Sequence, residues 1–394
     1  MSTISTLLDE FERLCESEEN KRRLSLWDTS ECGIRGETQW HSVPGYSVRE
    51  NPVMPVTAEC LEKIWQDILG LDLAKYHTDP EYFLEYHLKI RLKKFKEFPD
   101  DTPLTRDIPV CFGVTHEAGM LGQKVYLDTG EEPSFAKEAV VDENTDFSRK
   151  IDFNNNEYLA MVLPFYNKVK QLSGKDYNVI FPAWYRGPQG TALYIRGFQN
   201  LSMDLYLNPE FVHRLLRYVT DTQKEYEQWK AEYTGVPIAK ADLFNDDIPI
   251  MSPEAYKEFF FPYEQELSDF YGGVYYWHSC GDVTKHVPEI EKLSSIDIFD
   301  FGVTMENKLA GIENLTDPNK AVLELRVFAK PHVQECTEEE SKEYVRQILQ
   351  NCREKGIRKY VIRSSGMSIV LGAENDVKKL GRWVELVREV QEEA

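Results

Sequence analysis

The chain has 394 residues, of which 42% are hydrophobic, and its 46 basic and 67 acidic side chains give a net charge of −21. Nucleic acid is excluded as a partner by this charge, because lysine and arginine supply most of the affinity for phosphates. No apolar run approaches the roughly 20 residues of a membrane-spanning helix. The acidic N-terminus is unlike a signal peptide, and the seven irregularly spaced cysteines are unlike a disulfide framework. We therefore expect a cytoplasmic protein with no membrane contact.

The first hundred residues are predicted to be mainly helical. Ser2–Ser17 is a polar amphipathic stretch, Thr57–Leu71 has apolar residues at helical spacing, and the charged stretch Glu81–Phe98 follows. No alternation typical of a strand stands out among them. We therefore expect a mostly helical N-terminal extension over residues 1–105 and a second unit over 106–394. This extension could cover the mouth of the active site, form a homodimer interface or contact a partner protein.

Beyond residue 105, short apolar runs alternate with long helical patterns. This alternation implies parallel strands joined by crossover helices, and roughly seven or eight such units fit an α/β fold of the (βα)8 TIM-barrel type better than an open sheet. The predicted strands are Ile108–Val114, Val179–Trp184, Pro237–Phe244, Gly273–Cys280, Asp297–Gly302, Ala321–Phe328 and Lys359–Arg363. The predicted helices are Pro209–Tyr233, Pro253–Tyr271, Thr284–Leu293, Glu338–Lys355 and Glu374–Glu392. In either fold, the chemistry belongs at the carboxyl ends of the strands.

The segment that ends the strand Gly273–Cys280 has the clearest chemical signal. His278 and Cys280 are two residues apart on extended backbone, so both side chains point to one side. Imidazole and thiolate are preferred zinc ligands. The pattern therefore predicts a metal site, although an inert cysteine beside a hydrogen-bonded histidine is the other interpretation.

Four further strand ends carry candidate site residues. Asp246 and Asp247 close one strand, where a shared pocket would raise one pKa or hold a cation. His116 and Glu117 follow the first predicted barrel strand and could act as base, ligand or substrate contact, although the pattern favours a core histidine. The third group would form a substrate wall and an anion or hydroxyl anchor, and it comprises Trp184, Tyr185 and Arg186. Arg363, which ends the last predicted strand, should lie near the same site.

From residue 108 to 390, the sequence resembles the uroporphyrinogen decarboxylase superfamily, and within it the corrinoid-dependent methyltransferase branch. The resemblance lies in the Asp-Asp pair followed by SPEAYKEFFFPY, the strand ending HSCGD, the segment FAKPHVQECTEEE, and SSGMSIVLGAEN before the last helix. It implies a (βα)8 barrel. It also implies that His278 and Cys280 are zinc ligands.

The same resemblance implies a third zinc ligand, a cysteine, near position 365. Ser365 stands there instead, and no thiol is nearby. A catalytic zinc usually has three protein ligands. We therefore expect either an oxygen ligand, with Asp246, Asp247 and Glu117 as candidates, or weak or absent metal binding.

A site with fewer sulfur ligands is a better Lewis acid for an oxygen atom than for a thiol. The resemblance then implies methyl transfer from an O-methyl compound to the Co(I) corrinoid (cobalamin) of a separate partner protein, as in anaerobic O-demethylases. Tyr276 and Trp277, with Trp184 and Tyr185, would form aromatic walls suited to a methoxylated ring. The chain itself has no visible corrinoid-binding segment such as DxHxxG.

Two other functions remain open from the sequence. A metal-free decarboxylase of a porphyrinogen or another acid needs a cationic pocket, for which Arg186, Arg326 and Arg363 are the candidates. A non-catalytic relative that has lost its third metal ligand is the other.

Overall fold

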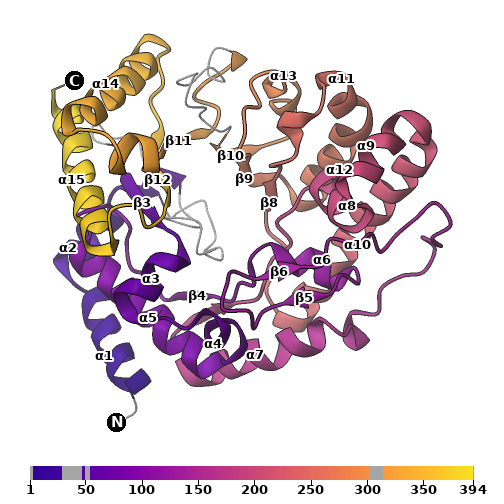
Figure 1. The fold of residues 1–394 in the computed structure, drawn as a ribbon, viewed down its shortest axis with the longest axis horizontal. Coiled ribbons are helices and arrows are strands. Elements are labelled where there is room, and N and C mark those ends of the chain that lie inside the picture. Colours follow the sequence, from indigo (N-terminus) through magenta and orange to yellow (C-terminus); the bar gives the residue numbers. More distant parts are fainter. Residues whose placement is uncertain (1–2, 29–46, 49–53, 301–313, 394) are drawn as a thin grey trace.

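The computed structural model describes residues 3–28, 47–48, 54–300 and 314–393. Within these ranges, eight parallel strands follow one another around a ring (Figure 1). They are β3 (Val56–Cys60), β4 (Asp107–Pro109), β7 (Asn178–Ile180), β8 (Ala241–Phe244), β9 (Val274–His278), β10 (Ile296–Asp300), β11 (Val322–Phe328) and β12 (Tyr360–Met367). The predicted (βα)8 barrel is confirmed.

Hydrogen bonds connect most of this ring. Six strands pair in the order β3-β12-β11-β10-β9-β8, and β4 pairs with β7. The segment after β7 joins β8 through the amide of Phe244, which donates to the Tyr185 carbonyl at 2.8 Å. Neighbours in the ring are neighbours in the chain, except where the last strand, β12, closes onto β3.

Long helices surround the strands (Figure 1). They are α5 (Pro80–Glu97), α7 (Leu159–Ser173), α10 (Pro209–Thr234), α12 (Phe261–Tyr271), α14 (Glu338–Glu354) and α15 (Ala373–Glu392). Their starts follow local chemistry: Thr337 and Glu340 form a capping box before α14, and the Asn208 side chain accepts from the Phe211 amide at the start of α10. None of the helices in the described ranges is both long enough and apolar enough to cross a membrane.

The described residues also form further helices and strands. The helices are α1 (Thr3–Cys15), α2 (Glu18–Leu24), α3 (Glu62–Leu69), α4 (Leu73–Thr78), α6 (His116–Met120), α8 (Pro188–Arg196), α9 (Phe198–Leu207), α11 (Pro253–Ala255) and α13 (Val287–Ile290). Two antiparallel pairs are formed by β1 (Trp27–Asp28) with β2 (Ser47–Val48) and by β5 (Val125–Tyr126) with β6 (Ser134–Phe135).

The stretch predicted as one helix, Thr57–Leu71, is a strand followed by a helix. Val56–Cys60 forms β3, which pairs with β12 through Ile362 and Val56, and α3 begins only at Glu62. The helical prediction was wrong here because the apolar spacing of α3 was extended backward over a five-residue buried strand. A barrel strand thus lies inside the region predicted to be a helical extension.

Candidate metal centre

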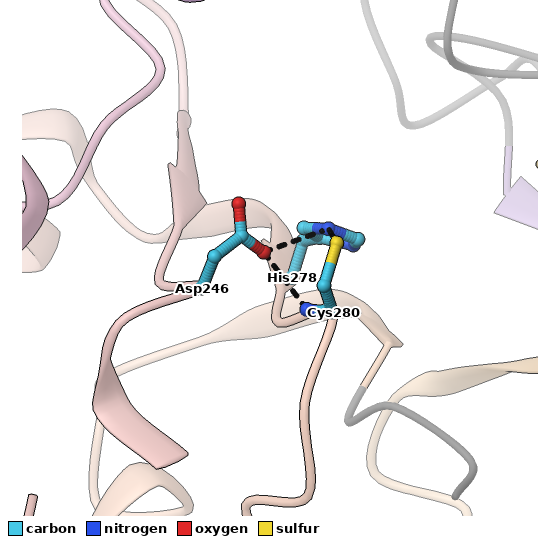
Figure 2. A group of neighbouring side chains, drawn as sticks. All are labelled: Asp246, His278 and Cys280. Atoms are coloured by element: carbon cyan, nitrogen blue, oxygen red, sulfur yellow. Dashed lines mark hydrogen bonds and ion pairs between the residues drawn. The ribbon is translucent and has the colours of Figure 1, made fainter. Parts of the chain in front are cut away.

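Asp246, His278 and Cys280 bring one ligand atom each to a common point (Figure 2). The ligand atoms all lie within 4.8 Å of one another. The His278 Nε2 atom is 3.2 Å from the Cys280 Sγ and 3.2 Å from the Asp246 Oδ1. The parallel pairing of β8 and β9 brings these residues together. Phe244 of β8 pairs with His278 of β9, so the residues just after Phe244 lie beside the end of β9.

Tight turns hold these ligands together. The Cys280 amide donates to the Asp246 Oδ1 at 2.8 Å, and the Asn245 amide donates to the His278 carbonyl at 2.7 Å. Next to Cys280, a Cβ added at Gly281 would lie 2.5 Å from the Cγ of Pro249. Only glycine allows the Cys280 turn to approach the loop after β8 so closely.

The electrostatics of the cluster suit a cation. Burial lowers the pKa of His278, but the carboxylates of Asp300 and Asp246 outweigh it and raise that pKa well above its usual value. Burial raises the pKa of Asp246, but His278 and Arg186 outweigh it and lower that pKa. Two carboxylates therefore face the His278 ring, and a bound divalent cation would take the place of the ring proton.

The donor set fits zinc. It combines an imidazole nitrogen, a thiol sulfur and a carboxylate oxygen, which are the three ligand types that zinc takes in proteins. Behind the ring, the Nδ1 atom of His278 lies 2.7 Å from the Oδ2 of Asp300. A carboxylate behind the ligating histidine is the usual arrangement in zinc sites.

The cluster faces a cavity of about 310 Å³ at the carboxyl ends of the strands. Both apolar and charged side chains line it, as expected of a small-molecule site. Among the described residues, the lining consists of Glu59, Leu61, Cys111, Gly113, Val114, Glu117, Tyr185, Arg186, Phe244, Asp246, His278, Cys280, Arg326, Arg363, Ser365 and Gly366.

Several of the predicted site residues thus share one cavity. Glu117 accepts from the Arg186 amide at 2.9 Å, which orients the loop after β7, and burial raises its pKa. Arg186 in turn places its Nη1 atom 2.9 Å from the Asp246 Oδ2. Asp247 does not line the cavity; its Oδ2 lies 3.7 Å from the same Nη1 atom, and burial raises its pKa.

His116 lies away from the cavity and does not fit the predicted acid or base role. Its ring is buried, with Nε2 at 2.7 Å from the Tyr226 hydroxyl and Nδ1 at 3.3 Å from the Tyr158 hydroxyl. Burial lowers its pKa to about 3. The core interpretation of this histidine is therefore the better one.

The predicted aromatic wall is also different in the structure. Trp184 follows β7 and packs toward α10, with its ring 6.0 Å from that of Tyr226. Trp277 faces α12, where it neighbours Glu264. Side chains alternate along a strand, so Trp277 points away from the face that carries His278. Tyr276 points inward, but its hydroxyl is bound to Asp300 and Glu324. Within the described part of the chain, the tyrosine and phenylalanine that line the cavity are Tyr185 and Phe244.

The buried carboxylates of Asp300 and Glu324, which pair with Arg326 and Arg363 at the cavity, were not predicted as part of the site. Arg363 places Nε 2.7 Å from Glu324 and Nη2 3.4 Å from Asp300, while Arg326 places Nη2 2.9 Å from Asp300. Arg363 was predicted as a substrate contact, and its charge is matched here by carboxylates. The signal that could have revealed Asp300 is its position, since it ends the strand next to that of His278.

Known proteins resemble this chain in sequence and in fold. A methylated-thiol–coenzyme M methyltransferase of Methanosarcina mazei is 26% identical over 193 residues, which is 48% of this chain and 50% of that relative. The match thus spans half the relative's length. The solved structure of a methyltransferase from Methanosarcina mazei superposes with a TM-score of 0.54 at 15% identity, over 86% of this chain and 92% of that one. This likeness concerns the fold alone.

The family model for uroporphyrinogen decarboxylase (URO-D) matches residues 45–390. That span includes β3 and every strand that positions the cavity. The chain belongs to the uroporphyrinogen decarboxylase family, and its curated relative is a methyltransferase.

Proposed function

We propose that this protein is a zinc-dependent methyltransferase that moves a methyl group from an O-methyl compound to the Co(I) corrinoid of a partner protein. The observation that carries the proposal is the convergence of Asp246, His278 and Cys280 within 4.8 Å at the wall of a cavity. The name of the curated relative, a methyltransferase, supports the reaction class.

The ligand set favours an oxygen-bound methyl group. A carboxylate in place of a second thiolate makes the site harder, and a zinc ion bound there would act as a Lewis acid on the substrate oxygen. The bond between the methyl carbon and that oxygen breaks, the oxygen keeps the electron pair and later takes a proton, and Co(I) supplies the pair for the new bond to carbon. Tyr185 and Phe244 give the cavity the aromatic surface to hold a methoxylated ring.

The residues of the chain have distinct tasks in this proposal. Arg186 holds one oxygen of Asp246, which leaves the other facing His278 and Cys280. Glu117 fixes the backbone that carries Arg186. Leu61 and Val114 give the cavity an apolar wall beside these charged groups.

A metal-free decarboxylase is disfavoured by the pairing of the arginines. Arg186, Arg326 and Arg363 line the cavity, but each lies within 2.9 Å of a carboxylate of the protein, namely Asp246, Asp300 and Glu324. Their charge is already balanced, so they offer little to a substrate with several carboxylates. A non-catalytic relative is disfavoured because Asp246 supplies the third ligand.

The test is the metal content of anaerobically purified protein. We expect about one zinc per chain in the wild type and a large loss in Asp246→Ala, His278→Ala and Cys280→Ser, with Cys336→Ser as a control away from the site. Methyl transfer to free Co(I) cobalamin is then followed spectroscopically with methoxylated aromatics. A wild type without metal, or one that decarboxylates a porphyrinogen, would overturn the proposal.

A further inference from the structure

Asp300 ends β10 behind the metal ligands and is fully buried, outside the lining of the cavity. Its Oδ2 lies 2.7 Å from the Nδ1 of His278, and its backbone carbonyl accepts from the Ser279 amide at 3.0 Å. The parallel register pairs Asp300 directly with His278. Asp300 therefore holds both the ring of His278 and the backbone between His278 and Cys280.

Arg326 of β11 completes this support from the other side. Its Nη2 lies 2.9 Å from the Oδ1 of Asp300 and donates to the Ser279 carbonyl at 2.5 Å. Both backbone groups of Ser279 are thus bound, the amide to β10 and the carbonyl to Arg326. The segment from His278 to Cys280 is anchored before any metal arrives.

We propose that Asp300 is a positioning residue for the metal centre: it orients His278 so that Nε2 faces the metal, and Arg326 holds Asp300 and the Ser279 backbone in place. The inference rests on the proposed metal site. An Nδ1–H group that donates to Asp300 leaves the Nε2 lone pair directed at the point shared by Asp246 and Cys280.

The guanidinium groups around Asp300 suit this role. Arg326 and Arg363 both approach its carboxylate, at 2.9 and 3.4 Å, so it stays an acceptor for the Nδ1 proton. A purely structural role, in which Asp300 only balances these two buried charges, is the competing explanation. The two explanations differ in what they predict for metal binding when His278 is absent.

The experiment measures Co(II) and Zn(II) affinity of the full chain by competition with a chromophoric chelator. We expect Asp300→Asn to bind metal 10- to 100-fold more weakly than the wild type, as is typical when the partner of a ligating histidine is lost. Glu324→Gln is the matched control, because Glu324 lies in the same network, bound to Tyr276 and Arg363. Within the described residues, these contacts connect Glu324 to the network without a hydrogen bond to His278. We expect the affinity of this control variant within about twofold of wild type.

A double-mutant cycle separates positioning from stability. If Asp300 acts through His278, adding Asp300→Asn to His278→Ala changes the affinity by less than about twofold. Thermal melting of the metal-free variants checks the fold, and Asp300→Asn combined with Arg326→Gln restores the charge balance if the single variant does not fold.

The failures are distinguishable. A wild type that binds no metal overturns the proposed function, and with it this inference. A wild type that binds metal, together with an Asp300→Asn variant of equal affinity, overturns only the positioning role. Equal losses from Asp300→Asn with and without His278 also overturn it, since the effect would then not pass through the ring.

Discussion

The guanidinium of Arg186 and the carboxylate of Asp246 meet at 2.9 Å across the ends of neighbouring strands. The contact uses the Oδ2 oxygen, while the Oδ1 oxygen accepts from the Cys280 amide and faces His278. In the proposed metal site, Asp246 is thereby limited to one ligand oxygen. An arginine 60 residues earlier in the chain thus orients the proposed third ligand.

Removal of this contact should weaken metal binding without removing a ligand. We expect Arg186→Gln to bind zinc about tenfold more weakly than the wild type, because the carboxylate of Asp246 can then rotate. Chelator competition measures the affinity. The exposed Arg13→Gln, on α1, serves as the control for loss of one positive charge. Unchanged affinity in Arg186→Gln would show that Asp246 is held by other groups.

The identity of the third ligand can be tested at two positions. We expect Asp246→Ala to lose most of its zinc, because its carboxylate lies beside the ligand atoms of His278 and Cys280. We expect Ser365→Ala to keep about one zinc per chain, because a neutral hydroxyl is not among the usual protein ligands of zinc. Elemental analysis after dialysis measures both. Loss of metal in Ser365→Ala but not in Asp246→Ala would show that the third ligand lies on β12 instead.

Glu264 should make the stability of the protein depend on pH. Burial between α12 and the barrel raises its pKa from 4.5 to about 8, so the folded chain holds a proton that the unfolded chain releases above pH 4.5. Stability from this group is fully present below pH 4.5 and is lost as the pH rises to 8, by about 1.4 kcal/mol per pH unit. We expect Glu264→Gln to remove this slope in denaturant unfolding.

The control for Glu264 is Glu258→Gln, an exposed position on the preceding turn. We expect it to keep the wild-type dependence of unfolding free energy on pH. Parallel curves for wild type and Glu264→Gln between pH 5 and 8 would show that Glu264 is ionised in the folded protein. Metal content should be the same in both variants, since neither residue lines the cavity.

Gly281→Ala should disturb the metal centre through packing alone. The new methyl group would lie 2.5 Å from Pro249, so the Cys280 turn must move away from the loop that carries Asp246. Such overpacking usually costs 1–3 kcal/mol, and we expect weaker zinc binding together with a lower melting temperature. Gly381→Ala, within α15, is the control, because its new methyl group would lie at an ordinary contact distance of 3.6 Å from the Cδ of Pro99. Normal zinc affinity in Gly281→Ala would show that the turn tolerates the shift.

The fold was predictable because its strands and helices differ in length and period. The helix predicted at Pro209–Tyr233 is α10, one residue longer, and the strands predicted around β9, β10 and β11 agree within a few residues. Strand β3 was missed since four buried residues and a half-buried one, just before an amphipathic helix, have no period of their own. Its pairing with β12 is a long-range contact that local pattern cannot reveal.

The candidate metal site was partly predictable for a related reason. His278 and Cys280 share one strand end, so their proximity follows from local geometry. The choice of Asp246 over Asp247 and Glu117 depends on side-chain direction after β8, which spacing does not determine. Trp184 and Trp277 were predicted to line the cavity only because they are aromatic residues near strand ends. Successive side chains of a strand point to opposite faces, and this alternation decides whether a side chain points into the barrel or toward the helices.

The closure of the barrel by β12 on β3 has a consequence for how the protein matures. Asp246 and Cys280 are 34 positions apart, whereas the Gly366 amide and the Glu59 carboxylate that it binds at the cavity wall are 307 apart. During synthesis the proposed metal ligands therefore leave the ribosome well before β12, whose Gly366 closes the cavity wall against Glu59. We expect zinc to be able to reach the nascent chain before the chamber is complete, which would make metal loading and chamber closure separate events.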